Sequence, residues 1–175
     1  MNLNKANRLL HRWATVFVVL PVLVMLLTGL LLQFKKQSSW IQPPTQRGVG
    51  DVPTIGFEEI LRVAQDVDEA GIENWSDVSR LDVRPDKGVV KVRSISSWEV
   101  QIDLQTGDVL SSSIRRSDFI ESLHDGSFFG EWVKMGIFLP AGVLMILMWV
   151  TGVYLFALPY ISRHKRRLRV QKNQP

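Results

Sequence analysis

Two long runs without a formal charge constrain this chain more than any other feature. The first covers the 22 residues from Trp13 to Phe34, and the second covers the 28 residues from Met135 to Ser162. A helix of about 20 residues matches the hydrocarbon thickness of a bilayer, so each run predicts a transmembrane helix. The alternative is a pair of buried helices in a soluble core, but a domain of this size does not need two such runs.

The charges around the two runs predict how the chain is oriented. The residues before the first run and those after the second carry nine Lys or Arg and no acid. All 17 acids lie between Asp51 and Glu131, and residues 37–133 have a net charge of −8. Because Lys and Arg beside membrane spans stay in the cytoplasm, we expect cytoplasmic termini and an exported middle at the inner membrane of a bacterium. Lys35 and Lys36 oppose this orientation, but the nine flanking charges outweigh them.

Several other classes of protein do not fit the sequence. The first run is too long for the core of a signal peptide, and no small-residue cleavage site follows it, so a retained anchor is expected. The chain has no cysteine, which excludes disulfides, thiol catalysis and cysteine-ligated metals. The basic tail adjoins a span rather than a folded basic domain. We therefore expect contact with the lipid bilayer and no nucleic-acid partner.

The middle of the chain predicts a small α+β domain. Apolar residues at helical spacing follow Thr54, which can cap the helix. Alternating residues in four later stretches then predict three or four antiparallel strands, with turns at Pro85–Gly88 and Gln105–Gly107. The helix is expected to cover one face of the sheet. The fold class is thus an α+β membrane protein, in which two transmembrane helices flank a domain of one helix and a sheet of three or four strands.

The expected boundaries divide the chain into seven parts. They are a cytoplasmic N-terminus (1–12), transmembrane helix 1 (13–34), a linker (35–53), a periplasmic domain (54–116), an interfacial helix and turn (117–133), transmembrane helix 2 (134–162) and a basic cytoplasmic tail (163–175).

Short motifs along the chain match a known family. Residues 100–110, Val-Gln-Ile-Asp-Leu-Gln-Thr-Gly-Asp-Val-Leu, resemble the strand–turn–strand element of a PepSY domain. Residues 10–13, Leu-His-Arg-Trp, and residues 123–130, Leu-His-Asp-Gly-Ser-Phe-Phe-Gly, resemble the entries to the spans of PepSY-associated transmembrane proteins. The pairs Thr28-Gly29 and Thr151-Gly152 match that family's "T-G" pairs, although such small residues commonly serve helix packing. The chain is thus similar to a small two-span member of the PepSY-associated transmembrane family.

The resemblance carries expectations about function. Some larger members of the family are inner-membrane reductases that bind haem through histidines and act on ferric siderophores. The resemblance therefore implies haem b, electron transfer and iron uptake. A chain with only two spans would then need a homodimer or a partner membrane subunit to complete a haem-bearing bundle.

Three histidines are available as haem ligands. Axial histidine is a common ligand of haem iron, and the resemblance favours His11 and His124 as the cofactor-binding residues. They are expected at opposite ends of the spans, so one chain cannot use both on one haem. A dimer could pair His11 with His11 and His124 with His124, and His11 could also pair with His164 on the inner side. The alternative interpretation is that these histidines have no ligand role and are ordinary interfacial residues, with His164 solvated in the basic tail.

No catalytic residues are predicted. The sequence shows no recognisable pairing of a nucleophile with a general base and no spacing typical of metal ligands. It also has no glycine-rich phosphate-binding loop and no dinucleotide-binding motif. Whether the chain is an enzyme is left open. A non-enzymatic binding or regulatory module, or an accessory subunit, is the alternative to a haem-bearing electron-transfer component.

Overall fold

Long helices account for the two apolar runs. The computed structural model describes residues 3–50 and 52–172. Helix α1 covers Leu3–Gln33. The second run lies in one π-helical turn (Lys134–Phe138) and α5 (Leu139–Lys172), which the short helix α4 (Glu131–Val133) precedes. These elements contain two stretches, Thr15–Gln33 and Glu131–Val150, that are long and apolar enough to span a membrane.

The side chains of these helices suit lipid rather than a soluble core. Leu20 is 67 % exposed, Leu30 is 62 % exposed and Trp149 is 69 % exposed. Apolar surface of this extent is not left in contact with water in a soluble protein. The chain forms two compact units, one comprising residues 1–26 and 125–175 and the other residues 27–124. The last turns of α1 therefore belong to the second unit.

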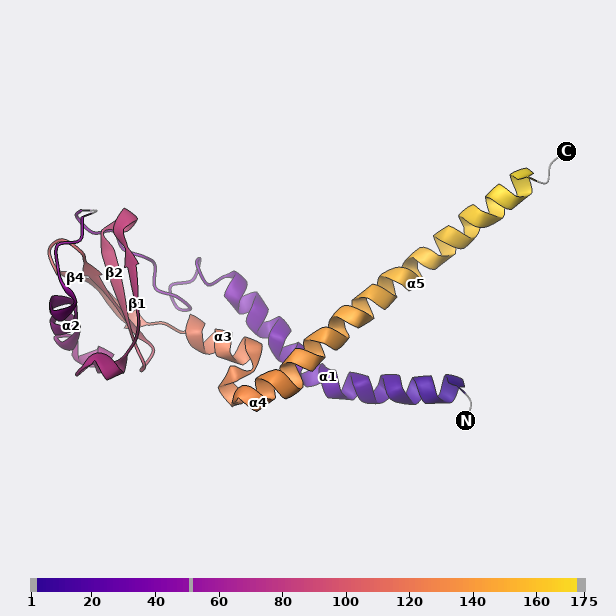
Figure 1. Ribbon diagram of the computed structural model, residues 1–175, viewed down its shortest axis with the longest axis horizontal. Helices are drawn as coiled ribbons and strands as arrows, with labels where there is room; N and C mark the ends of the chain where they lie inside the picture. The colour runs from indigo at the N-terminus through magenta and orange to yellow at the C-terminus, as the bar shows by residue number, and fades with distance from the viewer. Residues whose placement is uncertain (1–2, 51, 173–175) are drawn as a thin grey trace. The chain divides into compact units, whose positions relative to one another are not determined.

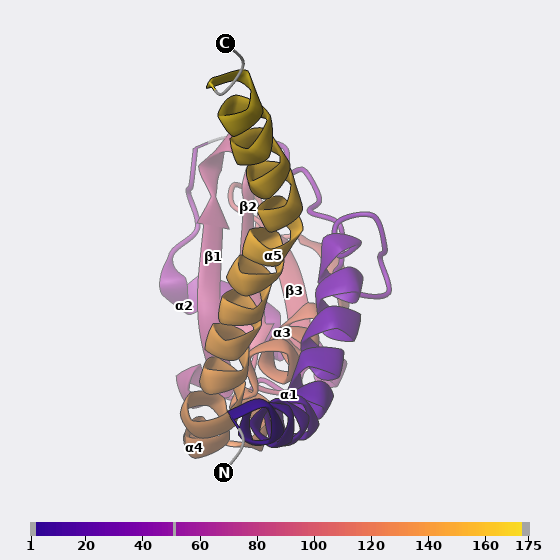
Figure 2. The ribbon, with the colours of Figure 1, turned by 90° about the vertical axis from the view of Figure 1, so that its right-hand side faces the viewer.

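A four-stranded antiparallel sheet lies at the centre of the second unit. Its strands are β1 (Val78–Arg84), β2 (Val89–Ser94), β3 (Trp98–Asp103) and β4 (Val109–Ile114), in the order β1-β2-β3-β4. β1, β2 and β3 follow one another across the sheet in Figure 2. Each connection is a short turn between neighbours, so the sheet is a simple meander as the sequence predicts.

One face of the sheet is apolar because alternate residues of β2 and β3 are Val or Ile. Helix α2 (Phe57–Gln65) lies against this face (Figure 1). The buried core between them consists of Ile60, Val63, Ala64, Ala70, Ile72, Val90, Val92, Val100, Ile102 and Leu104. The structure thus confirms the α+β fold class.

The predicted cap of α2 is wrong. Gly56, not Thr54, occupies the N-cap position, and no side chain caps the helix. Thr54 instead donates its hydroxyl hydrogen to the Gln105 carbonyl at 2.7 Å, and its backbone N–H bonds the Leu104 carbonyl. The Thr54 hydroxyl therefore bonds to the turn between β3 and β4, and not to the first turn of α2 as the local sequence predicts.

The opposite face of the sheet is polar and buried. Lys91, Glu99, Gln101 and Asp103 are each at most 1 % exposed. Residues 42–49, within the stretch that the sequence predicts as a linker, bond to Gln101 and Asp103 of this set and to Arg115. The Gln46 N–H donates to Gln101 Oε1 at 2.8 Å, and the Val49 N–H donates to Asp103 Oδ2 at 2.7 Å. This stretch is thus held on the sheet by hydrogen bonds.

Short elements complete the chain. Helix α3 covers Ser117–Asp125, after β4, and Gly126 follows it with φ of 80°, a conformation that favours glycine. Single 3₁₀ turns lie at Asp68–Ala70, Trp75–Asp77, Pro85–Lys87 and Ser127–Phe129.

Candidate functional site

His124 has a specific partner in the structure. Its half-buried side chain lies on α3, and its Nδ1 lies 3.0 Å from the hydroxyl oxygen of Thr28, near the end of α1. Thr28 is only 7 % exposed. The hydrogen bond joins two residues that are 96 positions apart, so the fold brings together two motifs that the sequence analysis treated separately.

Gly29 allows the close approach of the imidazole. A Cβ atom at this position would lie 3.3 Å from His124 Cε1 and 3.7 Å from Nδ1. The shorter distance is tighter than ordinary van der Waals contact. The Thr28-Gly29 pair therefore supplies both a hydrogen-bonding group and the space for the ring beside it.

The hydrogen bond to Thr28 bears on the chemistry of the other ring nitrogen. A hydroxyl can donate or accept, so either tautomer of His124 can make this bond. When Nδ1–H donates to Thr28, Nε2 carries a free lone pair. Metal-ligating histidines are commonly oriented by such a bond from their second nitrogen. The bond to Thr28 therefore orients the His124 ring through Nδ1 and leaves Nε2 outside this hydrogen bond.

Helix α3 is fixed to the segment that follows α1. The Ile41 carbonyl accepts hydrogen bonds from the backbone N–H groups of Arg116 and Ser117. The Arg116 guanidinium donates to the Trp40 carbonyl at 3.0 Å and lies 4.8 Å from the centre of the Trp40 ring. These contacts hold the start of α3 against the segment that follows α1. They therefore help to keep His124 close to Thr28.

An ion pair adds a second link between the same segments. Lys35 Nζ lies 2.9 Å from Glu121 Oε1. Both side chains are partly exposed, so the pair contributes little energy and serves mainly to orient α3.

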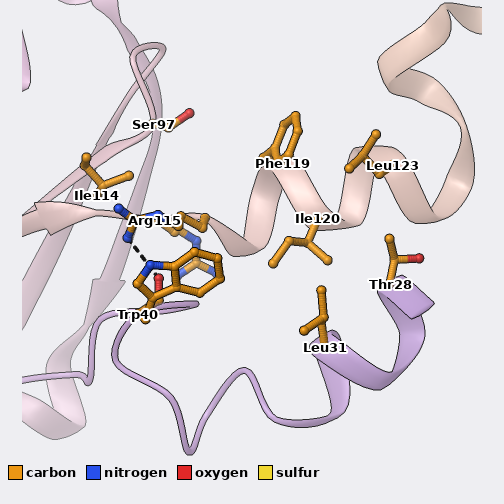
Figure 3. A pocket seen from close by; sticks show the side chains of 10 residues that line it. Thr28, Leu31, Trp40, Ser97, Ile114, Arg115, Phe119, Ile120 and Leu123 are labelled. Carbon is orange, nitrogen blue, oxygen red and sulfur yellow. Dashed lines mark hydrogen bonds between the residues drawn. The ribbon is translucent and has the colours of Figure 1, made fainter. Parts of the chain in front are cut away.

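An apolar groove of about 520 Å³ adjoins this arrangement (Figure 3). Thr28 lines the groove and also bonds His124. Two arginines, Arg115 and Arg116, lie among otherwise mostly apolar side chains. The lining consists of Thr28, Leu31, Trp40, Ser97, Ile114, Arg115, Arg116, Phe119, Ile120 and Leu123.

Arg115 connects the groove to the buried polar face of the sheet. Its Nη1 lies 2.9 Å from Glu99 Oε2, and its Nε lies 2.8 Å from Asp118. Glu99 also accepts a hydrogen bond from Lys91 at 2.9 Å. Burial lowers the pKa of Lys91, although the bond to Glu99 opposes that effect. Arg93 Nε lies 3.8 Å from Glu99 Oε2 without a hydrogen bond, so three cations surround this one buried carboxylate, which suits a structural role.

The other two histidines are not placed by side chain. His11 lies in α1 and His164 lies in α5, but their side chains lie outside the described part of the chain. Among the described residues, no three His, Asp or Glu side chains gather as a metal site. The structure therefore brings together His124, Thr28 and Gly29, and the pairing of His11 stays a prediction.

Sequence reasoning assigned Thr28 and Gly29 to helix packing, and it missed their contact with His124. A signal was present, because the "T-G" pair ends one span on the side where the Leu-His motif begins. Two polar residues at the same membrane level can meet, but the sequence does not show which faces they occupy.

The fold and site define a class of protein: a two-helix membrane protein that carries an α+β domain between its spans. A family model described as the PepSY-associated TM region matches residues 8–173. The chain therefore belongs to the PepSY-associated transmembrane family. No curated protein and no solved structure matches it.

Proposed function

We propose that this protein is a haem-binding electron-transfer component of the inner membrane, of the kind found in ferric-siderophore reductases. Family membership supports the general class. The basic residues at both ends of the chain support cytoplasmic termini and a periplasmic α+β domain. In this arrangement α3 and His124 lie on the periplasmic side.

The hydrogen bond between Thr28 and His124 carries the proposal. Haem iron takes axial histidine, and the Nε2 of an imidazole held through Nδ1 is ready to ligate it. The groove beside Thr28 offers apolar surface suited to a porphyrin. Arg116, whose Nη1 bonds the Trp40 carbonyl, offers positive charge suited to a propionate. Bound haem would supply one-electron transfer between a donor and an acceptor.

The residues of the chain would act by holding and orienting. Thr28 would keep the Nδ1 proton of His124 engaged, so that the ring presents a neutral Nε2. Gly29 would let the ring lie against α1. Arg116, held by the Trp40 carbonyl, would fix α3 relative to the end of the span.

A second imidazole would complete a bis-histidine site. His124 of a second copy, or a histidine of a partner membrane subunit, would supply it on the periplasmic side. His11 would serve an inner site by pairing with its own copy in a homodimer, or with His164. Histidines at the two levels would thus hold one haem on each side of the bilayer.

The test is the visible spectrum of the detergent-purified full-length protein, expressed with haem supply and recorded oxidised and dithionite-reduced. We expect a Soret band and a sharp reduced α-band of haem b. His124→Ala should lower the haem content per chain by about half if the inner site also exists and nearly completely if it does not, and His11→Ala should remove the inner half. His164→Ala separates the two inner pairings, because it should lower the haem content only if His164 is the partner of His11. Protein without a Soret band, or with unchanged haem content in both variants, would contradict the proposal.

One observation favours a binding or regulatory module as the second candidate. β1 and β4 are the edges of the sheet, and each pairs with only one neighbour. A partner segment could add to such an edge as a further strand.

An accessory subunit of a larger transporter or oxidase is the third candidate. Absence of haem would favour these two, and a stoichiometric partner that survives deletion of residues 54–115 would favour the accessory subunit.

A further inference from the structure

A second pocket of the sheet-containing unit has a different character from the groove. It measures about 360 Å³ and is lined by Lys36, Gln42, Pro43, Pro44, Thr45, Arg84 and Lys87. The lining holds three cationic side chains and no carboxylate. Residues 37–133 have a net charge of −8, so a pocket with three cations and no carboxylate in its lining is unusual for this domain.

Three separate segments bring these cations together. Lys36 lies three residues after the end of α1, Arg84 ends β1, and Lys87 lies in the turn that leads to β2. The Gly48 N–H donates to the Lys87 carbonyl at 2.8 Å, which fastens the covering stretch to that turn. A Cβ atom at Gly88 would overlap the backbone of Gly50, so glycine there permits the close contact.

Most of the positive charge in the pocket is not neutralised by the described residues. Arg84 Nη2 lies 2.8 Å from Asp82, and this hydrogen bond holds the pKa of Asp82 below its usual range. Among the residues that the structure describes, no carboxylate lies within 4.0 Å of the amino group of Lys36 or Lys87. Like charges that share a cavity repel each other, and an anion between them removes that cost.

Neutral donors in the lining suit the same ligand. The side-chain oxygen of Gln42 accepts a hydrogen bond from Arg115 Nη2 at 3.2 Å. With the oxygen engaged, the amide N–H groups of Gln42 remain to donate. Thr45 adds a hydroxyl, and the consecutive prolines Pro43 and Pro44 make one wall stiff.

We propose that this pocket binds an oxyanion, a phosphate or carboxylate group held by Lys36, Arg84 and Lys87. Arginine and lysine bind such groups through charge-assisted hydrogen bonds. The group could belong to an anionic lipid headgroup, because Lys36 lies just beyond the span, or to a soluble anion. The proposal also gives a reason for Lys36, whose charge opposes the expected orientation of the first span. It does not depend on haem.

The test uses the full-length protein in neutral detergent at low ionic strength, titrated with inorganic phosphate and with citrate by calorimetry. We expect saturable binding that is weakened at least about tenfold in Lys36→Gln/Lys87→Gln, since two charge-assisted contacts are lost. Arg47→Gln/Arg80→Gln is the matched control, because it removes two exposed cations of the same unit and leaves the pocket intact. Its affinity should stay within about twofold of wild type.

A second arm identifies the source of the anion. The protein is placed in nanodiscs of phosphatidylcholine with and without phosphatidylglycerol, and its unfolding temperature is measured. Stabilisation by phosphatidylglycerol that is lost in Lys36→Gln/Lys87→Gln would identify a lipid headgroup. Binding of phosphate or citrate without this lipid effect would identify a soluble anion. Absence of saturable binding in both arms, or equal weakening in both double variants, would overturn the proposal. The single variants Lys36→Gln and Lys87→Gln replace the double variant if it does not fold.

Discussion

The hydroxyl oxygen of Thr28 lies 3.0 Å from Nδ1 of His124, and this bond ties the end of the first span to the short helix that follows the sheet. It has two consequences. It fixes the ring of the one histidine whose side chain the structure describes, and it leaves Nε2 outside the bond.

The first prediction concerns Thr28. Thr28→Val removes the hydroxyl but keeps the shape of the side chain, so the imidazole loses its orienting partner. Loss of such a partner commonly costs about tenfold or more in metal affinity. We expect haem to be lost correspondingly faster to apomyoglobin, with a changed reduced spectrum. Thr28→Ser should retain the wild-type spectrum. If Thr28→Val loses haem at the wild-type rate, the hydrogen bond to His124 does not contribute to haem binding.

The second prediction concerns Gly29. A methyl group there would lie 3.3 Å from the His124 ring, so Gly29→Ala should displace α3 and lower the free energy of unfolding by about 1 kcal/mol. Gly142→Ala is the control. A Cβ at Gly142 meets nothing within 4 Å, so alanine there should be neutral or slightly stabilising. Thermal unfolding of both variants in the same detergent gives the comparison, and equal stability of the two would show that the close contact is unimportant.

The third prediction concerns the buried ion network around Glu99. Glu99→Gln leaves Lys91 without its carboxylate in a fully buried position. We expect a loss of about 3 kcal/mol in the free energy of unfolding of the α+β domain. Lys91→Met/Glu99→Gln should recover part of that loss, because one of the uncompensated charges around position 99 is gone, although Arg93 and Arg115 remain. Denaturant unfolding measures both, with exposed Glu69→Gln as a variant that should change stability little.

The fourth prediction concerns acid. Burial raises the pKa of Asp103, but hydrogen bonds from the N–H groups of Val49, Thr106 and Gln105 outweigh it and hold the pKa below its usual range. The stability that this carboxylate contributes is therefore present above the unfolded pKa of about 3.9 and is lost as the pH falls through the lower folded pKa.

Asp103→Asn tests this linkage. The variant should be about 2 kcal/mol less stable at neutral pH, because a charged acceptor of three N–H groups is lost. Its stability should then fall less than that of wild type as the pH drops to about 3. Exposed Asp86→Asn should follow the wild-type curve. Parallel acid curves for wild type and Asp103→Asn would contradict the assigned role.

The sequence predicts the elements of this fold well, because their signals are local. Uncharged runs give the long helices, and alternation with turn residues such as Gly88 and Gly107 gives the four strands. Local patterns of this kind do not predict contacts between segments that are distant in the sequence. The hydrogen bonds between residues 42–49 and the side chains of Gln101 and Asp103 are an example, because a stretch rich in Pro, Gln and Gly has the composition of a free linker.

The candidate site shows the same division. Motifs identify His124 and Thr28 separately, and their order along the chain suggests a common membrane level. Their pairing depends on the rotation of α1 and α3 about their own axes. That rotation is set by tertiary contacts such as Arg116 with Trp40, which no local pattern reports.

Electron paramagnetic resonance of the oxidised full-length protein tests the haem proposal most directly, because the spin state of ferric haem reports its axial ligands. We predict a low-spin signal of bis-imidazole ligation in wild type. In His124→Ala we predict the loss of that signal from the periplasmic haem, with high-spin or lost haem in its place. A wild-type protein without haem, or a low-spin signal of unchanged intensity in His124→Ala, would contradict the assignment of His124 as a ligand.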